Sequence, residues 1–215
     1  MTGFHAPPSD RLVLAPSGLH AVAVARTIDA RVFLDPAAPV TGIARPLARR
    51  LPGMPQVSDT GVTTLPRPLH IRFVRPYADL RRARFLPLLP DGALLDLGRD
   101  VLGTVTIRLD LKAGQVRSLA ARDAASLADH ATRIPVTLRD DALTMPGQLD
   151  GQAVTVRFDT APHDQPPPPA TLSVTIGGTP LPGRRDADGA VSIGWDAFAD
   201  RRLVLDLPHG AIWLD

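Results

Sequence analysis

The sequence predicts a mostly β, two-lobed fold with one or two short helices. Three observations support this prediction. A 20-residue stretch recurs without a gap 96 positions later, short apolar strand patterns outnumber helical ones, and 23 prolines interrupt the 215-residue chain. Two copies of one β unit in a chain of this length predict two lobes with a cleft between equivalent faces. We therefore expect an internal duplication, with the functional site in that cleft.

The repeat relates residues 97–116, LGRDVLGTVTIRLDLKAGQV, to residues 193–212, IGWDAFADRRLVLDLPHGAI. Gly98 aligns with Gly194, and both copies share an Asp two positions later, an LDL triplet and a late Gly. Each copy is expected to belong to one of the two lobes.

Strands are predicted wherever short alternating or β-branched runs are bounded by Gly, Pro or Asp. These runs lie at 19–27, 31–34, 69–74, 105–111, 153–158, 172–176 and 203–207. A short helix is predicted after Pro46, which suits a first turn, because Ile43, Leu47 and Leu51 then form one apolar stripe. A second, Ala-rich helix is predicted over 119–130.

These elements divide the chain into three predicted parts. The first lobe covers residues 1–116, a helical connector covers 117–135, and a second, shortened lobe covers 136–215. The run 165–170 contains four consecutive prolines and is expected to be an extended surface loop, because proline is excluded from helix interiors and central strands.

Composition excludes several classes of function. The net charge is only +2, from 24 basic and 22 acidic residues, and aromatic residues make up 4%, so nucleic acid is not an expected partner. Arginine, alanine, proline and leucine are abundant in a manner typical of GC-rich, bacterial-type coding. No cysteine is present, and the six histidines lack metal-ligand spacing, so no metal and no cofactor are expected.

No membrane association is expected, because no stretch approaches the roughly 20 apolar residues that span a bilayer. The first ten residues, MTGFHAPPSD, lack the charged and then apolar order of a signal peptide. The default expectation is a soluble cytoplasmic protein. A periplasmic or secreted location would follow if an export signal had been removed.

Two strand ends and two later motifs carry a family resemblance. One apolar strand ends at Asp35, and another ends at Asp159-Thr160-Ala161. The segments Leu97-Gly98-Arg99-Asp100 and Ile193-Gly194-Trp195-Asp196 follow them. This arrangement resembles the retropepsin-like and pepsin-like aspartic peptidases, in which a strand ends at Asp-Thr/Ser-Gly and a hydrophobic-Gly-x-Asp motif closes the lobe. The chain thus resembles an internally duplicated, degenerate member of that family.

The resemblance implies that Asp35 and Asp159 are the catalytic residues, one from each lobe, and that Pro36, Ala37, Thr160 and Ala161 form the supporting turns. In such a site two carboxyl groups share one proton. The ionised group activates a water molecule, and the protonated group polarises the scissile carbonyl. The pair titrates as a unit. The implied activity is acid-type endopeptidase hydrolysis of an extended polypeptide, and assembly into oligomers is not required.

Departures from the family pattern leave an alternative open. Pro36 has neither the hydroxyl nor the N–H that braces the family's turn, and Ala37 and Ala161 replace two glycines. Each alanine would cost about 1 kcal/mol or more if its φ were positive. The second copy is also 28 residues shorter, so the loop and helix and the hairpin of the first copy are expected to be missing from it. The alternative is a catalytically inactive pseudo-peptidase that acts as a binding or scaffold protein; a third reading is a general β-rich binding domain.

A literal Asp59-Thr60-Gly61 also occurs. It follows Pro55-Gln56-Val57-Ser58 rather than an apolar strand, so it is interpreted as a hairpin turn and a candidate tip of a flap over the cleft. A catalytic role for Asp59 is the competing interpretation. For Asp35 and Asp159 the competing interpretations are a strand-end turn and a strand-end cap.

Asp100 and Asp196 have a separate, structural interpretation. Each follows a glycine expected to be buried, and each is expected to cap the short helix that comes next.

Overall fold

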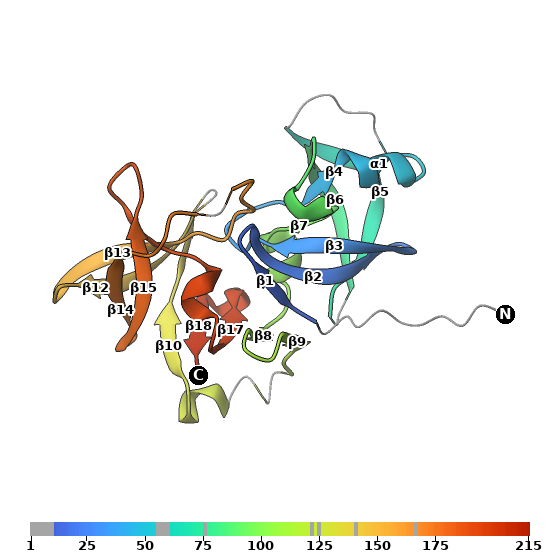
Figure 1. Cartoon of the computed structure of the whole chain (residues 1–215). Coiled ribbons are helices and arrows are strands. Elements are labelled where there is room, and N and C mark those ends of the chain that lie inside the picture. Colours follow the sequence, from blue (N-terminus) through green and yellow to red (C-terminus); the bar gives the residue numbers. More distant parts are fainter. Residues whose placement is uncertain are drawn as a thin grey trace.

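The predicted fold class is confirmed: the molecule is mostly β and has two lobes joined by a shared sheet, with two short α-helices among the described residues (Figure 1). The structure is a computed structural model that describes residues 11–54, 61–74, 77–120, 123, 126–139, 142–165 and 167–215. Within these residues no helix is long and apolar enough to cross a membrane.

The first lobe is built on a seven-stranded sheet of order β1-β2-β3-β7-β4-β6-β5, which a further pairing of β2 with β5 closes on itself. Its strands and helices are β1 (Val13–Ala15), β2 (Gly18–Ala25), β3 (Ile28–Leu34), β4 (Gly42–Ala44), α1 (Arg45–Arg50), β5 (Val62–Arg72), β6 (Tyr77–Leu86), η1 (Pro90–Gly92), β7 (Leu95–Leu97) and α2 (Arg99–Leu102). The helix predicted after Pro46 is α1, and its stripe residues Ile43, Leu47 and Leu51 are all buried.

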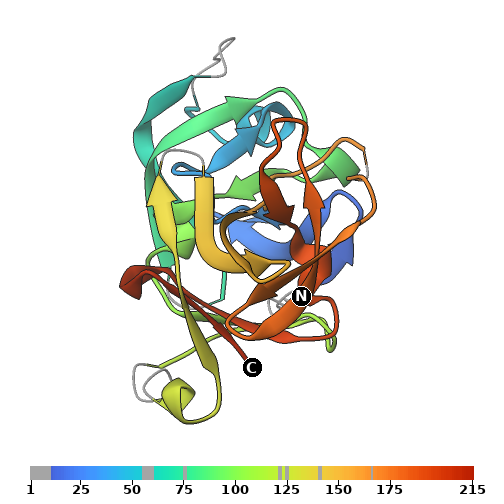
Figure 2. The same cartoon turned by 90° about the vertical axis from the view of Figure 1, so that its left-hand side faces the viewer.

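The second lobe repeats this plan in a six-stranded sheet of order β11-β12-β13-β16-β15-β14, closed by a pairing of β12 with β14 (Figure 2). Its elements are β11 (Thr137–Arg139), β12 (Ala142–Leu149), β13 (Gln152–Phe158), β14 (Leu172–Ile176), β15 (Thr179–Arg185), β16 (Val191–Ile193) and η3 (Trp195–Phe198). In both lobes the strand that ends at the candidate Asp runs parallel to the short strand that precedes the shared glycine.

The two lobes match residue by residue over more of the chain than the sequence repeat shows. Strands β1, β2 and β3 begin and end 124 positions before β11, β12 and β13. The turn between β2 and β3 has a positive φ of 55° at Arg26, and the turn between β12 and β13 has one of 51° at Asp150. Both turns therefore give the hairpin the same local twist. Asp35 and Asp159, also 124 positions apart, are structurally equivalent.

Among the described residues, the second lobe has no counterpart of β4, which in the first lobe lies between β7 and β6, and none of α1. In the second lobe β15 pairs directly with β16 instead. The expectation that the second copy would also lack the hairpin is wrong, because β14 and β15 form one in the place of β5 and β6. The described residues of the Pro-rich run 165–170 form neither helix nor strand, as predicted.

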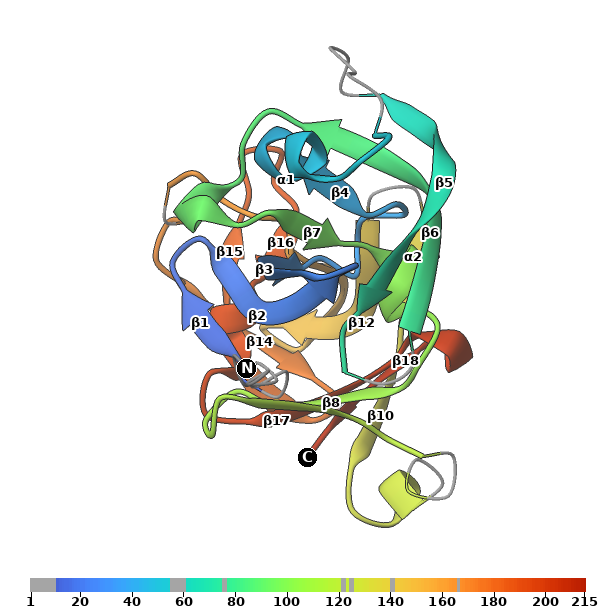
Figure 3. The same cartoon turned by 90° about the vertical axis from the view of Figure 1, so that its right-hand side faces the viewer.

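A five-stranded sheet of order β10-β18-β17-β8-β9 joins the halves (Figure 3). Its strands are β8 (Ile107–Asp110), β9 (Gln115–Ser118), β10 (Thr132–Pro135), β17 (Arg202–Asp206) and β18 (Ala211–Leu214), with η4 (Leu207–His209) between the last two. Strands β8 and β17 come from the two copies of the sequence repeat and pair with each other. The backbone N–H of Leu12 donates to Gly114 O, and that of Val136 donates to Gly210 O, so each lobe enters this sheet in the same manner.

The predicted lobe boundary at residue 116 falls inside β9, and the predicted connector 117–135 contains η2 (Ser126–Asp129) and β10. Part of the Ala-rich segment 119–130 lies outside the described residues, so its full course stays a prediction. A single buried apolar cluster extends through both lobes. In the second lobe Phe158 packs edge-on against Trp195, with ring centroids 4.7 Å apart, directly before the candidate residue Asp159.

Candidate functional site

Asp35 and Asp159 each lie one residue beyond a central strand of their lobe. The Asp35 N–H donates to Leu97 O at 3.0 Å, and the Asp159 N–H donates to Ile193 O at 2.8 Å. Leu97 and Ile193 themselves precede the repeated glycines. These paired bonds fix the backbone of both residues in equivalent positions, because a buried N–H needs an acceptor.

A cleft of about 360 Å³ brings the two lobes' residues together. Asp35, Arg84 and Asp96 line it from the first lobe; Arg157, Asp159, Thr160 and Asp164 line it from the second. The structure therefore brings Asp35, Ala37, Asp159, Thr160 and Ala161 to one cavity. Among the described residues no hydrogen bond joins the Asp35 carboxyl group to the Asp159 carboxyl group, and each has another partner.

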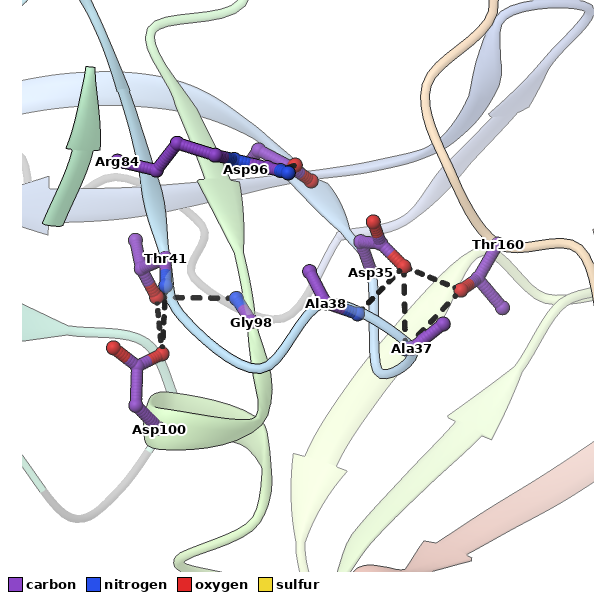
Figure 4. A network of polar contacts seen from close by, with 9 residues as sticks. All are labelled: Asp35, Ala37, Ala38, Thr41, Arg84, Asp96, Gly98, Asp100 and Thr160. Carbon is purple, nitrogen blue, oxygen red and sulfur yellow. Dashed lines mark hydrogen bonds and ion pairs between the residues drawn. The ribbon is translucent and has the colours of Figure 1, made fainter. Parts of the chain in front are cut away.

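The Asp35 carboxyl group is 4% exposed and is held by three donors on one oxygen (Figure 4). The Thr160 hydroxyl donates to Asp35 Oδ1 at 2.5 Å, and the backbone N–H groups of Ala37 and Ala38 donate to the same oxygen at 3.2 and 3.3 Å. Burial raises the pKa of Asp35, and these three hydrogen bonds oppose that rise. Among the described residues, no hydrogen bond is made to the other carboxyl oxygen, Asp35 Oδ2.

Thr160 is the brace between the two candidate turns. Its hydroxyl donates to Asp35 and accepts from the Ala37 N–H at 3.3 Å, so it ties the second lobe to the first. Pro36, at the equivalent position, cannot return the contact, since it has neither hydroxyl nor N–H. The strain considered for Ala37 and Ala161 does not arise, because neither residue is among the described non-glycine residues with positive φ.

Asp159 has a different environment. Its Oδ2 lies 3.1 Å from His163 Nε2, and its side chain is 28% exposed. Burial raises the pKa of Asp159, whereas the charge of His163 lowers it. His163 is itself positioned by its backbone N–H, which donates to Ser17 O at 2.9 Å. The sequence analysis considered the histidines only as metal ligands and did not predict that His163 contacts Asp159. The position of His163 four residues after Asp159 could have indicated this contact.

Asp96 and Arg84, which both line the cleft, form an ion pair that sequence reasoning also missed. Arg84 Nη2 lies 3.1 Å from Asp96 Oδ2, and the Asp96 side chain is 1% exposed. Burial, followed by the negative charge of Asp35, raises the pKa of Asp96 to about 8. The sequence does contain an indication of this pair: Asp96 lies between two leucines in the apolar strand Leu95-Asp96-Leu97. A carboxyl group is rarely buried in a protein unless it is paired.

Gly98 allows the close packing that supports Asp35. A Cβ at this position would lie 2.8 Å from the carbonyl carbon of Val40 and 2.9 Å from Ala38 O, both in the loop that follows Asp35. The Gly98 N–H donates to the Thr41 hydroxyl at 3.1 Å, and the Thr41 hydroxyl donates to Asp100 Oδ1 at 2.6 Å (Figure 4). No residue larger than glycine fits here without moving backbone.

The interpretation of Asp100 and Asp196 as helix caps is wrong. Asp100 accepts hydrogen bonds from the N–H and hydroxyl of Thr41, and Asp196 accepts one from Arg184 Nη2 at 2.6 Å. The N-cap positions of α2 and η3 have no side-chain hydrogen bond. Neither residue is at the N-cap position: Asp196 holds the Arg184 side chain, and Asp100 binds Thr41 together with backbone N–H groups of the first turn of α2.

The alternative catalytic triplet falls at the edge of the described chain. Asp59 and Thr60 lie outside the described residues, so their role as a flap tip or as a catalytic turn stays a prediction. Gly61 is exposed and directly precedes β5. Within the described residues no group of three or more His, Asp or Glu side chains could hold a metal ion.

Comparison with known proteins shows the fold alone. No family model matches the sequence, and no curated protein matches it. Among solved structures, the fold is similar to that of conglutin gamma, described as a unique basic 7S globulin from lupine seeds. The TM-score is 0.54 at 9% sequence identity, over 96% of this chain and 94% of that chain. At this identity the likeness concerns chain topology and carries no assignment of activity.

Proposed function

We propose that this protein is aspartic-peptidase-like: it binds an extended polypeptide in the cleft between its lobes and hydrolyses it with Asp35 and Asp159. One observation carries the proposal. Two carboxyl groups from structurally equivalent strand ends line the same cleft of about 360 Å³. A duplicated fold that directs one acidic residue from each half to a common cavity supplies the two carboxyl groups that acid-type peptide hydrolysis needs.

The two environments suggest different roles for the carboxyl groups. Asp159 Oδ2 lies 3.1 Å from His163 Nε2, and the charge of His163 opposes the rise that burial causes in the pKa of Asp159, so we assign Asp159 as the base toward a water molecule. The buried Asp35 carries the proton and donates it toward the carbonyl oxygen of the scissile peptide bond. As the water attacks, Asp159 takes its proton and a tetrahedral diol forms. The diol collapses as Asp159 passes this proton to the leaving nitrogen, Asp35 recovers a proton from one hydroxyl of the diol, and the C–N bond breaks, which leaves a carboxylic acid and an amine.

Preorganisation of Asp35 supports this assignment. The Thr160 hydroxyl and two backbone N–H groups hold Asp35 Oδ1, which fixes the orientation of the whole carboxyl group. Asp35 Oδ2 therefore points in its reactive direction before the substrate binds, and the carboxyl group does not have to reorient during the reaction. His163 is a positioning residue in this scheme, because it acts through Asp159 and does not touch the substrate.

A second candidate function, binding without hydrolysis, is favoured by the partners of the two acids. Asp35 is bonded to Thr160 and Asp159 to His163, while Pro36 removes the reciprocal brace that would draw the two turns together. A pseudo-peptidase would retain the peptide-binding cleft and lack the shared proton.

Cleavage of unfolded casein between pH 3 and pH 7 tests the proposal. We expect activity in the native sequence, and a loss of at least a hundredfold in both Asp35→Asn and Asp159→Asn, since each substitution removes one proton carrier. Asp29→Asn is the matched control, because Asp29 is exposed on the same strand, β3. It should cleave casein at the native rate.

The possible results separate the candidates. Activity that survives either substitution would overturn the assigned site. Saturable binding of casein peptides without cleavage would establish the pseudo-peptidase, and the absence of both binding and cleavage would overturn the proposed function.

A further inference from the structure

One of the residues that line the cleft, Asp96, has a buried carboxyl oxygen with no hydrogen-bond partner among the described residues. Asp96 lies on β7, in register with Phe33 of β3 and with Gly42 of β4. A Cβ on Gly42 would lie 3.2 Å from Asp96 Cβ, so this glycine leaves the space in which the Asp96 side chain sits. Asp96 lines the cleft, and its side chain is 1% exposed.

Within the described part of the chain, only one of the two carboxyl oxygens of Asp96 accepts a hydrogen bond. Arg84 Nη2 donates to Asp96 Oδ2 at 3.1 Å, while Asp96 Oδ1 and Arg84 Nε have no hydrogen-bond partner. A buried acceptor left unpaired costs about 1–3 kcal/mol, and more when it is charged. Proteins rarely retain such an atom without a role for it. Above a pH of about 8, where Asp96 is ionised, Oδ1 can accept from a donor that enters the cleft.

The charges around the cleft indicate what kind of donor fits. Four carboxyl groups line it and only two guanidinium groups do; the carboxyl groups are Asp35, Asp96, Asp159 and Asp164, and the guanidinium groups are Arg84 and Arg157. Arg157 is engaged by Asp186 and Asp188, each at 3.2 Å. Around Asp96 itself the charged neighbours are Asp35, Arg84 and Asp100. The imbalance favours a cation, whose N–H groups also supply the missing donor.

The second lobe does not offer the same group. Ser192 occupies the position equivalent to Asp96, 96 residues later in the repeat, and its hydroxyl donates to Asp186 at 2.5 Å. The unpartnered acidic oxygen thus belongs to the first lobe alone. An extended ligand that crosses the cleft would meet it on one side only.

We infer that Asp96 forms a subsite for a basic side chain, arginine or lysine, of the polypeptide bound in the cleft. The inference rests on the proposed function, because it places the cation on a peptide ligand. The guanidinium or ammonium group donates to Asp96 Oδ1 and offsets the charge of Asp96 when that group is ionised. Asp96 is a specificity-determining residue in this scheme and takes no part in bond cleavage.

Binding of n-butylguanidinium, measured by calorimetry, tests the subsite without requiring hydrolysis. The neutral isostere n-butylurea is the reference ligand. A guanidinium group stays charged at pH 9, whereas Asp96 ionises near pH 8, so the cation should bind at least tenfold more tightly at pH 9 than at pH 6. Asp96→Asn should weaken binding at pH 9 at least tenfold, and n-butylurea should show neither effect.

Two variants separate a specific subsite from general attraction to an acidic cleft. Asp164→Asn removes one charge from an exposed position of the same cleft, and Ser192→Ala alters the equivalent position of the other lobe. Each should change the affinity for n-butylguanidinium less than threefold. An equal loss in Asp164→Asn and Asp96→Asn, or the absence of saturable binding to the native protein, would overturn the inference.

Carboxyl ¹³C spectra of the native protein provide a second measurement that does not depend on any variant folding. Saturating n-butylguanidinium should lower the pKa of Asp96 by at least one unit, and an unchanged titration would overturn the subsite. Cleavage of casein without this cation effect would remove the subsite and leave the proposed function standing. If the cation lowers the pKa of Asp96 but the protein neither cleaves nor binds peptide, the cation site stands and the proposed function is overturned.

Discussion

Replacement of Asp96 by Asn should change how the stability of the protein depends on pH. Asp96 is buried, and its pKa in the folded protein is about 8, compared with the ordinary value of 3.8. Between these two values the folded protein retains a proton that the unfolded chain has lost. The free energy of unfolding therefore falls as the pH rises through this range. Asn resembles the protonated acid and can still accept the Arg84 hydrogen bond.

The size of the effect follows from the pKa change. One pKa unit corresponds to about 1.4 kcal/mol, so the free energy of unfolding of Asp96→Asn should gain about 1.4 kcal/mol on the native protein for each pH unit. The gain begins near pH 4, ends near pH 8 and reaches about 6 kcal/mol. The negative charge of Asp35 is one cause of the raised pKa of Asp96, so its contribution is already included in this range.

Urea unfolding at pH 4, 5, 6, 7 and 8, followed by tryptophan fluorescence, measures this difference. Ser192→Ala is the control, since it alters the equivalent position in the other lobe without removing a titratable group. Its stability should run parallel to that of the native protein. Parallel curves for Asp96→Asn and the native protein would refute the reasoning, as would a difference that shrinks as the pH rises.

Three further predictions concern the residues that hold the site. Thr160→Val should destabilise the protein by about 2 kcal/mol in urea unfolding, because two buried hydrogen bonds are lost, and it should raise the pKa of Asp35 in carboxyl ¹³C spectra. Gly98→Ala should cost about 3 kcal/mol in the same unfolding assay, because the added Cβ meets backbone atoms at 2.8–2.9 Å. His163→Gln should raise the pKa of Asp159, since the charge that lowers it is removed.

Matched variants check the reasons given. Thr160→Ser keeps the hydroxyl and should retain most of the stability that Thr160→Val loses. Gly61→Ala adds a Cβ where no atom lies within 4 Å, so it should have little effect on stability. A Gly61→Ala variant as unstable as Gly98→Ala, or a Thr160→Ser variant as unstable as Thr160→Val, would contradict the packing and hydrogen-bond arguments.

The duplication is visible in the sequence only where backbone packing limits the choice of residue. Gly98 must be glycine because loop backbone lies against it, and its partner Gly194 recurs 96 positions later. The sequence indicated the matching strand ends at Asp35 and Asp159, but the equivalence of the preceding strands, 13–34 with 137–158, was not apparent, although these strands share the same bounds. A strand needs only suitable alternation and a turn, so Arg26 and Asp150 occupy the same left-handed turn position without a shared residue type.

By itself, the sequence determined the mostly β class, the repeated closing motif, the helix after Pro46 and the two strand ends at Asp35 and Asp159. These features depend on residues close together in the chain, whose periodicity and backbone preferences are local properties. Only the tertiary structure decided that Thr160 reaches Asp35, that Arg84 pairs with Asp96, and that one oxygen of Asp96 is left without a donor. Such contacts arise when strands pair and lobes dock, and no local pattern along the chain encodes that geometry.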